Sequence, residues 1–409
     1  MICGLLGEKL GHSYSPRIHR ELGSYSYELF EVEPERLGDF LLQGSFDGLN
    51  VTIPYKKAVM PYCAELSETA RSIGSVNTIV RRKDGSLYGY NTDFDGFSWL
   101  LARNGGIRKG EKALVLGSGG ASLTVQAVLK SCGAEVIVIS RRGEHTYDTL
   151  ERHKDAVLLV NTTPVGMYPK NMESPAELDK LPKLRCVLDL IYNPARTRLL
   201  LDAEKRGIPF EGGLSMLVGQ AKRAAELFTG KTLPDSCNNN ILCKLQREMQ
   251  NIILIGMPGC GKSSVGKKLA QALDRPFYDA DGQIVEKIGC SIPEFFAREG
   301  EEAFRRAESE VLSQLGKGSG CVIATGGGCV TREENYPLLH QNGVIVWLQR
   351  ELSALPTEGR PISQSTALGE LYARRRPLYE QFCDFAVRNT QAQEHAVHGI
   401  ISALNQQVR

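Results

Sequence analysis

The chain has 409 residues, which at about 150 residues per domain predicts two or three domains, each with a core of its own. Lys and Arg number 49 against 47 for Asp and Glu, and hydrophobic residues make up 42% of the chain. This is the composition of an ordinary soluble globular protein, and it excludes a disordered or collagen-like chain. Neither half has the basic excess of a protein that binds nucleic acid or an anionic membrane, so we expect no partner of either kind.

The apolar segments and the cysteines favour a cytoplasmic protein. No apolar run approaches the roughly 18 residues that a membrane-spanning helix needs. Met1 leads into a short apolar stretch without a cationic leader or a cleavage site. The 11 cysteines are scattered and never spaced C-x-x-C, which favours reduced thiols over disulfides or a zinc site. We therefore expect a cytoplasmic chain without a structural metal.

Short runs rich in Val, Ile and Leu alternate with helical patterns along nearly the whole chain. Such continuous apolar runs are typical of strands in parallel sheets that helices cover on both faces. The predicted fold class is therefore α/β. The predicted strands span residues 113–117, 135–140, 156–160, 186–190, 251–256, 321–325 and 344–348.

Two stretches are candidate domain boundaries. Between residues 229 and 251 a Gly-Lys-Thr-Leu-Pro turn precedes the candidate N-cap residues Asp235 and Ser236, a helical stretch and a new apolar strand. A weaker boundary lies near residue 103, where the turn-rich and charged segment 103–112 precedes the next strand. The first of these joins is short and reads as helical.

The strand at 113–117 runs into a glycine-rich loop and then an apolar helical pattern. The loop follows the dinucleotide-binding pattern G-x-G-x-x-G, with Ser122 in the place of the third glycine. Glycines let the backbone turn tightly and approach a pyrophosphate, which then lies at the positive end of the helix. By itself the loop also fits a simple turn. Its residues are Gly117, Ser118, Gly119, Gly120 and Ala121.

The end of the next strand indicates which dinucleotide the loop would bind. That strand ends at Ser140, Arg141 and Arg142, about where an NAD site carries an acidic residue for the ribose hydroxyls. An arginine there suits a 2′-phosphate, because its planar fork can bind two phosphate oxygens. We therefore expect NADP rather than NAD. The alternative is two solvated arginines after an edge strand.

Seven short motifs around this loop resemble those of the shikimate dehydrogenase family, in the family's order, and the resemblance covers about residues 1 to 245. It implies a substrate-binding domain at 1–103, completed by helices at about 214–247, and a Rossmann-like NADP domain at 104–213. It further implies reduction of 3-dehydroshikimate to shikimate. The motifs are GHSYSP at 11–16, NVTIPYK at 50–56, VNT at 76–78, NTD at 91–93, NTTPVGM at 161–167, DLIYNP at 189–194 and MLVGQ at 216–220.

Reduction of a carbonyl by hydride leaves negative charge on its oxygen, so the site needs a proton donor. The resemblance places Lys56 and Asp93 beside the reacting oxygen, with Lys56 as general acid and base; the residues alone also fit a surface ion pair. By resemblance Ser13 and Ser15 hold the substrate carboxylate, although they also fit turn residues before Pro16. The resemblance further implies that Thr52, Asn77, Tyr192 and Gln220 contact hydroxyls or the carboxylate, and that Leu190 and Gly213 line the nicotinamide.

A second phosphate loop follows the apolar strand at 251–256. Residues 256–263 read G-x-x-x-x-G-K-S, and a helical pattern from about Ser264 to Leu273 follows, which is the context of a P loop. Its backbone N–H groups are expected to hold phosphates, with Lys262 on the β and γ oxygens and Ser263 on Mg²⁺. ATP is the expected ligand. The loop residues assigned to it are Gly259, Cys260, Gly261, Ser263 and Ser264.

From about residue 250 to its C-terminus the chain is similar to the shikimate kinase family, in the order and approximate spacing of the motifs. The resemblance implies a P-loop kinase domain at 250–409 with a parallel sheet. It also implies phosphorylation of shikimate at the 3-hydroxyl. The motifs are DAD at 279–281, FRRAE at 304–308, GGG at 326–328, GRP at 359–361 and RRPLY at 375–379.

The kinase motifs supply candidate site residues. Alternate residues of an extended segment point to opposite faces, so we expect Asp279 and Asp281 to address different ligands. By resemblance Asp279 lies on the magnesium side and Asp281 near the acceptor hydroxyl as its candidate base. Glu308, one helical turn beyond Arg305, is expected to orient that guanidinium. The resemblance also assigns Arg305 and Arg375 to the acceptor carboxylate, Gly327 to the ring, and Arg360, in the mobile lid, to the transferring phosphoryl group.

The product of the first implied reaction is the acceptor of the second. The sequence therefore predicts a bifunctional enzyme of aromatic biosynthesis that uses NADPH, and then ATP with Mg²⁺. Two alternatives stay open: an NAD-linked quinate/shikimate dehydrogenase joined to another small-molecule P-loop kinase, and a catalytically silent metabolite sensor. The joint presence of six candidate catalytic and binding residues argues against the sensor: Lys56, Asp93, Lys262, Asp281, Arg305 and Arg360.

Overall fold

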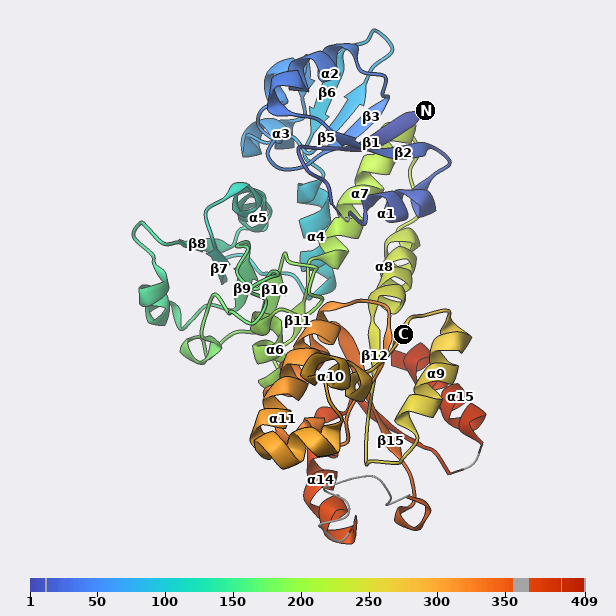
Figure 1. Cartoon of the computed structure of the whole chain (residues 1–409). Coiled ribbons are helices and arrows are strands. Elements are labelled where there is room, and N and C mark those ends of the chain that lie inside the picture. The colour runs from blue at the N-terminus through green and yellow to red at the C-terminus, as the bar shows by residue number, and fades with distance from the viewer. Residues whose placement is uncertain (12, 356–367, 391, 408–409) are drawn as a thin grey trace. The chain divides into compact units, whose positions relative to one another are not determined.

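The structure is a computed structural model that describes residues 1–11, 13–355, 368–390 and 392–407. The chain forms two compact units, Met1–Leu242 (unit 1) and Cys243–Arg409 (unit 2). The division falls inside helix α8 (Ser236–Met249), in the stretch that the sequence indicates as a helical join. Figure 1 follows the chain from blue at the N-terminus to red at the C-terminus.

The first sheet of unit 1 has six strands in the order β2-β1-β3-β5-β6-β4. They are β1 (Ile2–Gly7), β2 (Ser26–Glu31), β3 (Gly48–Val51), β4 (Glu65–Leu66), β5 (Thr78–Arg81) and β6 (Leu87–Tyr90). β1 pairs in parallel with β2 and β3, whereas β5 is antiparallel to both of its neighbours. The helices of this part are α1 (Ser15–Leu22), α2 (Leu37–Gln43) and α3 (Glu68–Ile73). Leu6, Leu49 and Ile79 form the core of the sheet together with Leu41 of α2.

The second sheet of unit 1 is entirely parallel, in the order β11-β10-β9-β7-β8. Its strands are β7 (Lys112–Leu116), β8 (Glu135–Ile139), β9 (Leu158–Asn161), β10 (Cys186–Asp189) and β11 (Phe210–Glu211), and the first four confirm the strands predicted in this region. Helices α4 (Asp93–Arg103), α5 (Gly120–Ser131) and α6 (Arg198–Lys205) cover it. Alternate residues face opposite layers, because Val115 packs in one cluster with α4 and α5 and Leu114 in another with α6.

Helix α7 (Leu214–Thr229) follows the second sheet and returns to the first one. It packs along α4, and near its end Phe228 joins Cys3 of β1 in a buried cluster. The residues after 213 therefore complete the core under the first sheet.

Unit 2 contains a five-stranded parallel sheet in the order β13-β14-β12-β15-β16. The strands are β12 (Asn251–Ile255), β13 (Phe277–Asp279), β14 (Val322–Ala324), β15 (Gly343–Gln349) and β16 (Phe385–Arg388). The strands predicted near 251, 321 and 344 are confirmed, and Ile253, Ile323 and Ile345 are fully buried.

Helices enclose the sheet of unit 2. They are α9 (Lys262–Leu273), α10 (Ala280–Ile288), α11 (Ile292–Lys317), α12 (Asn335–His340), α14 (Leu368–Phe382) and α15 (Gln393–Gln407). α9 begins two residues earlier than the sequence pattern indicates, within the first turn where helix starts are hard to place. Gly300, with φ at 81°, interrupts α11. Across the described part of the chain, no helix has both the length and the apolar character needed to cross a bilayer.

Candidate active sites

Lys56 and Asp93 form an ion pair in unit 1. Lys56 lies in the turn after β3, and Asp93 is the first residue of α4. The ammonium Nζ is 2.6 Å from Oδ2 of the carboxylate. The two side chains are 30% and 17% exposed, so the pair is partly shielded from water yet open to a small molecule. A carboxylate at this distance holds the ammonium in place, and the ammonium can give a proton to a developing alkoxide.

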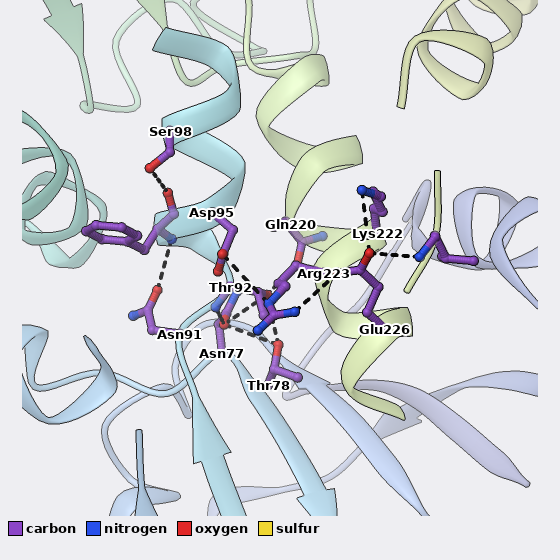
Figure 2. Close-up of polar contacts among 12 residues, drawn as sticks. Asn77, Thr78, Asn91, Thr92, Asp95, Ser98, Gln220, Lys222, Arg223 and Glu226 are labelled. Atoms are coloured by element: carbon purple, nitrogen blue, oxygen red, sulfur yellow. Dashed lines mark hydrogen bonds and ion pairs between the residues drawn. The ribbon is translucent and has the colours of Figure 1, made fainter. Parts of the chain in front are cut away.

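Asn77 and Gln220 come together through Thr92, the residue that precedes Asp93. The Thr92 N–H donates to Oδ1 of Asn77 at 2.6 Å, and its hydroxyl lies 3.5 Å from Oε1 of Gln220. Figure 2 shows these side chains converging: Asn77 directly precedes β5, Thr92 directly precedes α4, and Gln220 lies on α7. Two predicted substrate residues therefore lie beside the N-terminus of α4, where the predicted catalytic Asp93 also lies.

Ser13 and Ser15 form a turn at the start of α1. The backbone N–H of Ser15 donates to Oγ of Ser13 at 3.2 Å. Tyr14 between them makes an edge contact with Tyr192, at 5.8 Å between ring centroids, so Tyr192 lies beside this turn. Burial raises the pKa of Tyr192, which keeps its hydroxyl protonated. Thr52 directly follows β3 and is half-buried.

The first glycine-rich loop lies between β7 and α5, as predicted. Gly117 has φ at 99°, and a Cβ there would lie 2.8 Å from Cγ2 of Thr163, so the turn requires glycine. Gly119 is the N-cap of α5, and no described side chain caps this helix. The first N–H groups of α5 therefore fit a pyrophosphate. Ser118, Gly120 and Ala121 are exposed around the same helix start.

The residues after β8 fit a phosphate on the ribose. The hydroxyl of Ser140 donates to the backbone carbonyl of Arg142, which closes a tight turn. Arg141 and Arg142 are both exposed on this turn. Two accessible guanidinium groups and no carboxylate at this position suit a 2′-phosphate better than two free hydroxyls.

A buried carboxylate ties together the loops after β9 and β10. Oδ1 of Asp189 accepts hydrogen bonds from the side chain of Asn161 and the N–H of Ile191, both at 3.0 Å, and Oδ2 accepts one from Thr197 at 2.7 Å. Burial raises the pKa of Asp189 to about 6, although these hydrogen bonds oppose the rise. These hydrogen bonds position the next residue, Leu190. The backbone of Leu190 lies close to Gly213, since a Cβ added to Gly213 would be 3.1 Å from the Cα of Leu190.

The P loop of unit 2 connects β12 to α9. Gly261 is the N-cap of α9 with φ at 99°, and no described side chain caps this helix, so its first N–H groups fit phosphate oxygens. Nζ of Lys262 donates to the carbonyls of Gly256 at 2.9 Å and Met257 at 3.1 Å, so the loop closes around its lysine. Ser263 and Ser264 are exposed in the first turn of α9, and Cys260 is buried within the loop.

One cavity of about 650 Å³ joins the P loop to the predicted acceptor residues. Lys262 and Ser263 line it, and so do Arg305 and Arg375. A single space is therefore lined by groups that suit a phosphate and by groups that suit a carboxylate. Its wall also includes Gly259, Gly261, Ser264, Asp281, Glu308 and Gly327.

Arg305 and Glu308 form a buried ion pair on α11, as their spacing predicts. Nη1 of Arg305 donates to Oε2 of Glu308 at 2.7 Å, and the side chains are 6% and 1% exposed. Burial raises the pKa of Glu308, and the charge of Arg305 opposes that rise. A Cβ on Gly326 would lie 2.6 Å from Oε1 of Glu308 and 2.9 Å from Oδ1 of Asp281. The turn at 326–328, called the glycine turn below, thus leaves room for both carboxylates.

Arg375 is buried on α14 and faces the same cavity. Burial lowers the pKa of Arg375, and the nearby charge of Arg305 lowers it further. Tyr379, one turn later, donates its hydroxyl to the carbonyl of Gly327 at 2.5 Å and fixes the glycine turn. Two guanidinium groups held near each other repel, so an anion such as a carboxylate between them is stabilising.

The prediction that Asp279 and Asp281 lie on one extended segment is wrong. β13 ends at Asp279, whose Oδ1 accepts the N–H of Asp281 at 3.1 Å and so caps α10. Asp281 lies in the first helical turn and lines the cavity, whereas Asp279 does not line it. The two carboxylates have different surroundings because the chain turns into a helix between them. Arg360 lies outside the described residues.

Sequence reasoning missed several residues that hold these sites. Thr78 and Thr92 lie within the motifs at 76–78 and 91–93, so the sequence does contain a signal for them. Asn389 had no motif around it, yet its side chain donates to the carbonyl of Cys260 at 2.8 Å, inside the P loop. Arg350 also lines the cavity of unit 2.

Two family models match the chain. The model of the shikimate dehydrogenase substrate binding domain matches residues 5–79, and the shikimate kinase model matches residues 258–405. Among curated relatives, the shikimate dehydrogenase (NADP(+)) of Clostridium beijerinckii is 38% identical over 268 residues, which span 60% of this chain and 98% of the relative.

Solved structures agree with these matches. A chorismate mutase/shikimate 5-dehydrogenase fusion protein from Clostridium acetobutylicum has a TM-score of 0.57 at 39% identity, over 60% of this chain and 96% of that chain. Shikimate 5-dehydrogenase from Thermus thermophilus, in complex with NADP(H) and shikimate, has a TM-score of 0.54 at 33% identity, over 60% of this chain and 99% of that chain. Since such relatives are matched over nearly their whole length, the chain belongs to the shikimate dehydrogenase family, and it carries a shikimate kinase domain in residues 258–405.

Proposed function

We propose that this bifunctional enzyme reduces 3-dehydroshikimate to shikimate with NADPH and then phosphorylates shikimate at its 3-hydroxyl with ATP. The product of the first reaction is the acceptor of the second, and both steps belong to the shikimate pathway to aromatic amino acids. The observation that carries the proposal is that one chain holds the Lys56–Asp93 pair in unit 1 and, in unit 2, a cavity lined by both Lys262 and Arg305.

In unit 1 we assign the substrate to residues 1–103 with the helices at 214–247, and the dinucleotide to residues 104–213. When bound, NADPH supplies the hydride. Lys56 gives its proton to the oxygen of the carbonyl, and Asp93 holds the ammonium in place, which their 2.6 Å contact supports. The other assignments follow the sequence: Ser13 and Ser15 bind the carboxylate, and Thr52, Asn77, Tyr192 and Gln220 bind the hydroxyls or the carboxylate.

We assign the dinucleotide to the loop at 117–121 and to the residues after β8. Arg141 and Arg142 would bind the 2′-phosphate, and Leu190 and Gly213 would lie against the nicotinamide. The exposed arginines favour NADPH over NADH, and the curated relative is named for NADP(+), which weighs against the NAD-linked alternative. Initial rates with NADPH and NADH at equal concentration test this preference.

In unit 2 we assign Lys262 and the loop backbone to the ATP phosphates. Ser263 is exposed on the cavity and offers a hydroxyl oxygen, which suits Mg²⁺. Asp281 would accept the proton of the attacking hydroxyl, since it lines the cavity beside the glycine turn. Arg305 and Arg375 would hold the carboxylate, with Glu308 orienting Arg305 and Gly327 close to the ring. Roles for Asp279 at the metal and for Arg360 at the phosphoryl group stay predictions.

We place both reactions in the cytoplasm. From Cys3 to Cys383 the cysteines are free thiols in the structure, and three of the buried ones lie in a core β-strand or directly before one, as reduced cysteines commonly do. Immunolocalisation or fractionation of cells that express the chain tests this placement.

Two lysine variants separate the proposed activities. Lys56→Ala should lower the rate of reduction by about 100-fold or more and leave phosphorylation intact, because it removes the general acid. Lys262→Ala should abolish phosphorylation and leave reduction intact. Lys57→Ala and Lys267→Ala, which change exposed lysines nearby, are the matched controls and should keep both activities. Equal loss of both activities in either site variant would contradict two independent sites.

A further inference from the structure

The side-chain amide of Asn77 is held in one orientation. Its Oδ1 accepts the backbone N–H of Thr92 at 2.6 Å, and the hydroxyls of Thr78 and Thr92 both lie 3.2 Å from the same oxygen. A backbone N–H can only donate, so the amide nitrogen cannot take the place of this oxygen. The nitrogen is therefore turned away from the threonines, and it makes no hydrogen bond to another described residue.

Thr78 is the centre of this arrangement. It is fully buried, and besides Asn77 its hydroxyl contacts that of Thr92 at 2.9 Å. It also accepts a hydrogen bond from Nδ2 of Asn50 at 3.1 Å. Because Asn50 supplies the donor, the hydroxyl proton of Thr78 is left for Asn77 or Thr92. Figure 2 shows Thr78 below Asn77 and Thr92, at the start of β5.

The far end of the arrangement is anchored in the core. The hydroxyl of Tyr27 donates to Oδ1 of Asn50 at 2.7 Å. The Tyr27 ring is stacked on His19 at 3.9 Å between centroids. Burial lowers the pKa of His19 to about 3, so this ring is neutral near pH 7. Asn50 and Thr78 are buried and Tyr27 is partly buried, so these hydrogen bonds are largely shielded from water, which strengthens them.

The near end reaches two more candidate site residues. Thr92 is the N-cap of α4, whose first residue is Asp93, the partner of Lys56. The Thr92 hydroxyl also lies 3.5 Å from Oε1 of Gln220 on α7. The buried hydroxyl of Thr78 thus contacts the side-chain oxygen of Asn77 directly. It also contacts the hydroxyl of Thr92, the residue that precedes α4.

We propose that Thr78 is a positioning residue of the dehydrogenase site, which orients the Asn77 amide nitrogen, and through Thr92 the start of α4, toward a hydroxyl of the bound ring acid. The inference rests on the proposed function, in which Asn77 contacts the substrate. Thr78 itself is fully buried, so its hydroxyl is not exposed to a bound molecule. Its hydroxyl, not its volume, carries the role.

The test is a double-mutant cycle on the NADP⁺-dependent oxidation of shikimate, run without ATP so that the kinase site does not contribute. Thr78→Val keeps the shape and removes the hydroxyl, and it should lower kcat/KM for shikimate by about 3- to 10-fold. Thr78→Ser restores the hydroxyl and should stay within about 2-fold of the wild type. If Thr78 acts through Asn77, then adding Thr78→Val to Asn77→Ala should cost less than it does in the wild type.

Two further readouts separate positioning from a general loss of structure. The affinity for NADPH and the kinase activity should be unchanged in Thr78→Val. Tyr27→Phe removes only the hydroxyl that holds Asn50 and serves where Thr78→Val does not fold; it too should lower kcat/KM less in the Asn77→Ala background than in the wild type.

Several outcomes would overturn the inference. Independent effects, in which the losses of the two single variants multiply in the double variant, would contradict action through Asn77. Equal losses in Thr78→Ser and Thr78→Val would show that the hydroxyl is not what matters. A wild-type chain that does not oxidise shikimate would contradict the proposed function and the inference with it, whereas independent effects in an active chain contradict the inference alone.

Discussion

Gly96 of α4 lies directly against Gly219 of α7, where a Cβ on Gly219 would be 3.1 Å from the Cα of Gly96. A Cβ on Gly96 would lie 2.5 Å from the carbonyl oxygen of Met216 and 2.9 Å from the backbone nitrogen of Gln220. The two helices therefore cross at a distance that side chains larger than hydrogen do not allow. This crossing brings Gln220 to the start of α4, where Thr92 and Asp93 lie.

Gly96→Ala should separate the two helices. The added methyl group meets backbone atoms that cannot rotate away, so we expect unit 1 to lose about 1–3 kcal/mol of unfolding free energy. Because Gln220 moves away from Thr92, kcat/KM for shikimate should also fall in the dehydrogenase reaction, while the kinase activity stays. Thermal unfolding and steady-state kinetics measure the two effects.

The matched control is Gly369→Ala, in the first turn of α14. A Cβ on Gly369 meets no described atom within 4 Å, so this change should leave stability unchanged or slightly higher. Wild-type stability and kinetics in Gly96→Ala would contradict the close crossing.

Glu308→Gln should weaken the acceptor end of the kinase cavity. It removes the charge that Arg305 faces inside the protein, and breaking a buried ion pair costs about 3 kcal/mol of unfolding free energy. Arg305 is then less well oriented, so KM for shikimate in the kinase reaction should rise about 10-fold while KM for ATP changes little.

Glu310→Gln, on the same helix, is the control. Glu310 pairs with Lys287 at 2.8 Å, but the side chains are 63% and 44% exposed, and such surface pairs contribute little. We expect this variant to match the wild type in stability and in both KM values. If Glu308→Gln also matches the wild type, the role of Glu308 is wrong.

Asn389→Ala should affect the nucleotide and not the acceptor. Nδ2 of Asn389 donates to the carbonyl of Cys260, and a Cβ on Gly261 would lie 2.6 Å from the same nitrogen, so this amide holds the peptide at the turn of the P loop. Its loss should raise KM for ATP by about 3- to 10-fold, with KM for shikimate unchanged. Asn405→Ala, at an exposed position on α15, is the control. An equal rise in both KM values would show a general loss of structure instead.

Asp189 should make the stability of unit 1 depend on pH. Burial raises its pKa to about 6 in the folded chain, against about 4 in the unfolded chain. Folding therefore takes up a proton between about pH 4 and pH 6. The contribution of this proton to the unfolding free energy is complete below about pH 4 and is lost as the pH rises through 6.

Asp189→Asn removes this proton uptake. Urea unfolding in a Trp347→Phe background leaves Trp99 of α4 as the fluorophore that reports on unit 1. The wild type should gain unfolding free energy relative to Asp189→Asn as the pH falls from 6.5 to 4. A difference that stays constant over this range would contradict the raised pKa.

The sequence was most informative where the structure is local. Buried parallel strands are continuous apolar runs, so the strands around Val115 and Ile253 could be predicted from the apolar runs in the sequence. The pairing of Arg305 with Glu308 follows from helical spacing. Both phosphate loops were recognisable because glycine is required where φ is positive, as at Gly117 and Gly261.

The sequence does not predict long-range contacts, and one local signal, the N-cap at Asp279, was missed. Tyr27 and Thr78 are joined through Asn50, so three segments must fold before their hydrogen bonds exist, and no spacing predicts them. The alternation of faces that an extended segment predicts holds only as far as Asp279, the last residue of β13. Aspartate is a favoured N-cap residue, and its hydrogen bond to the N–H of Asp281 starts α10 at once.

The most direct test of the central claim is a coupled assay of the purified full chain with 3-dehydroshikimate, NADPH, ATP and Mg²⁺, in which NADPH consumption and organic phosphate product are followed together. We predict that shikimate 3-phosphate forms, that omission of ATP stops the reaction at shikimate, and that omission of NADPH yields no phosphorylated product. Phosphorylation of 3-dehydroshikimate without NADPH, or oxidation of NADPH without any phosphorylated product when ATP is present, would contradict the two-step account.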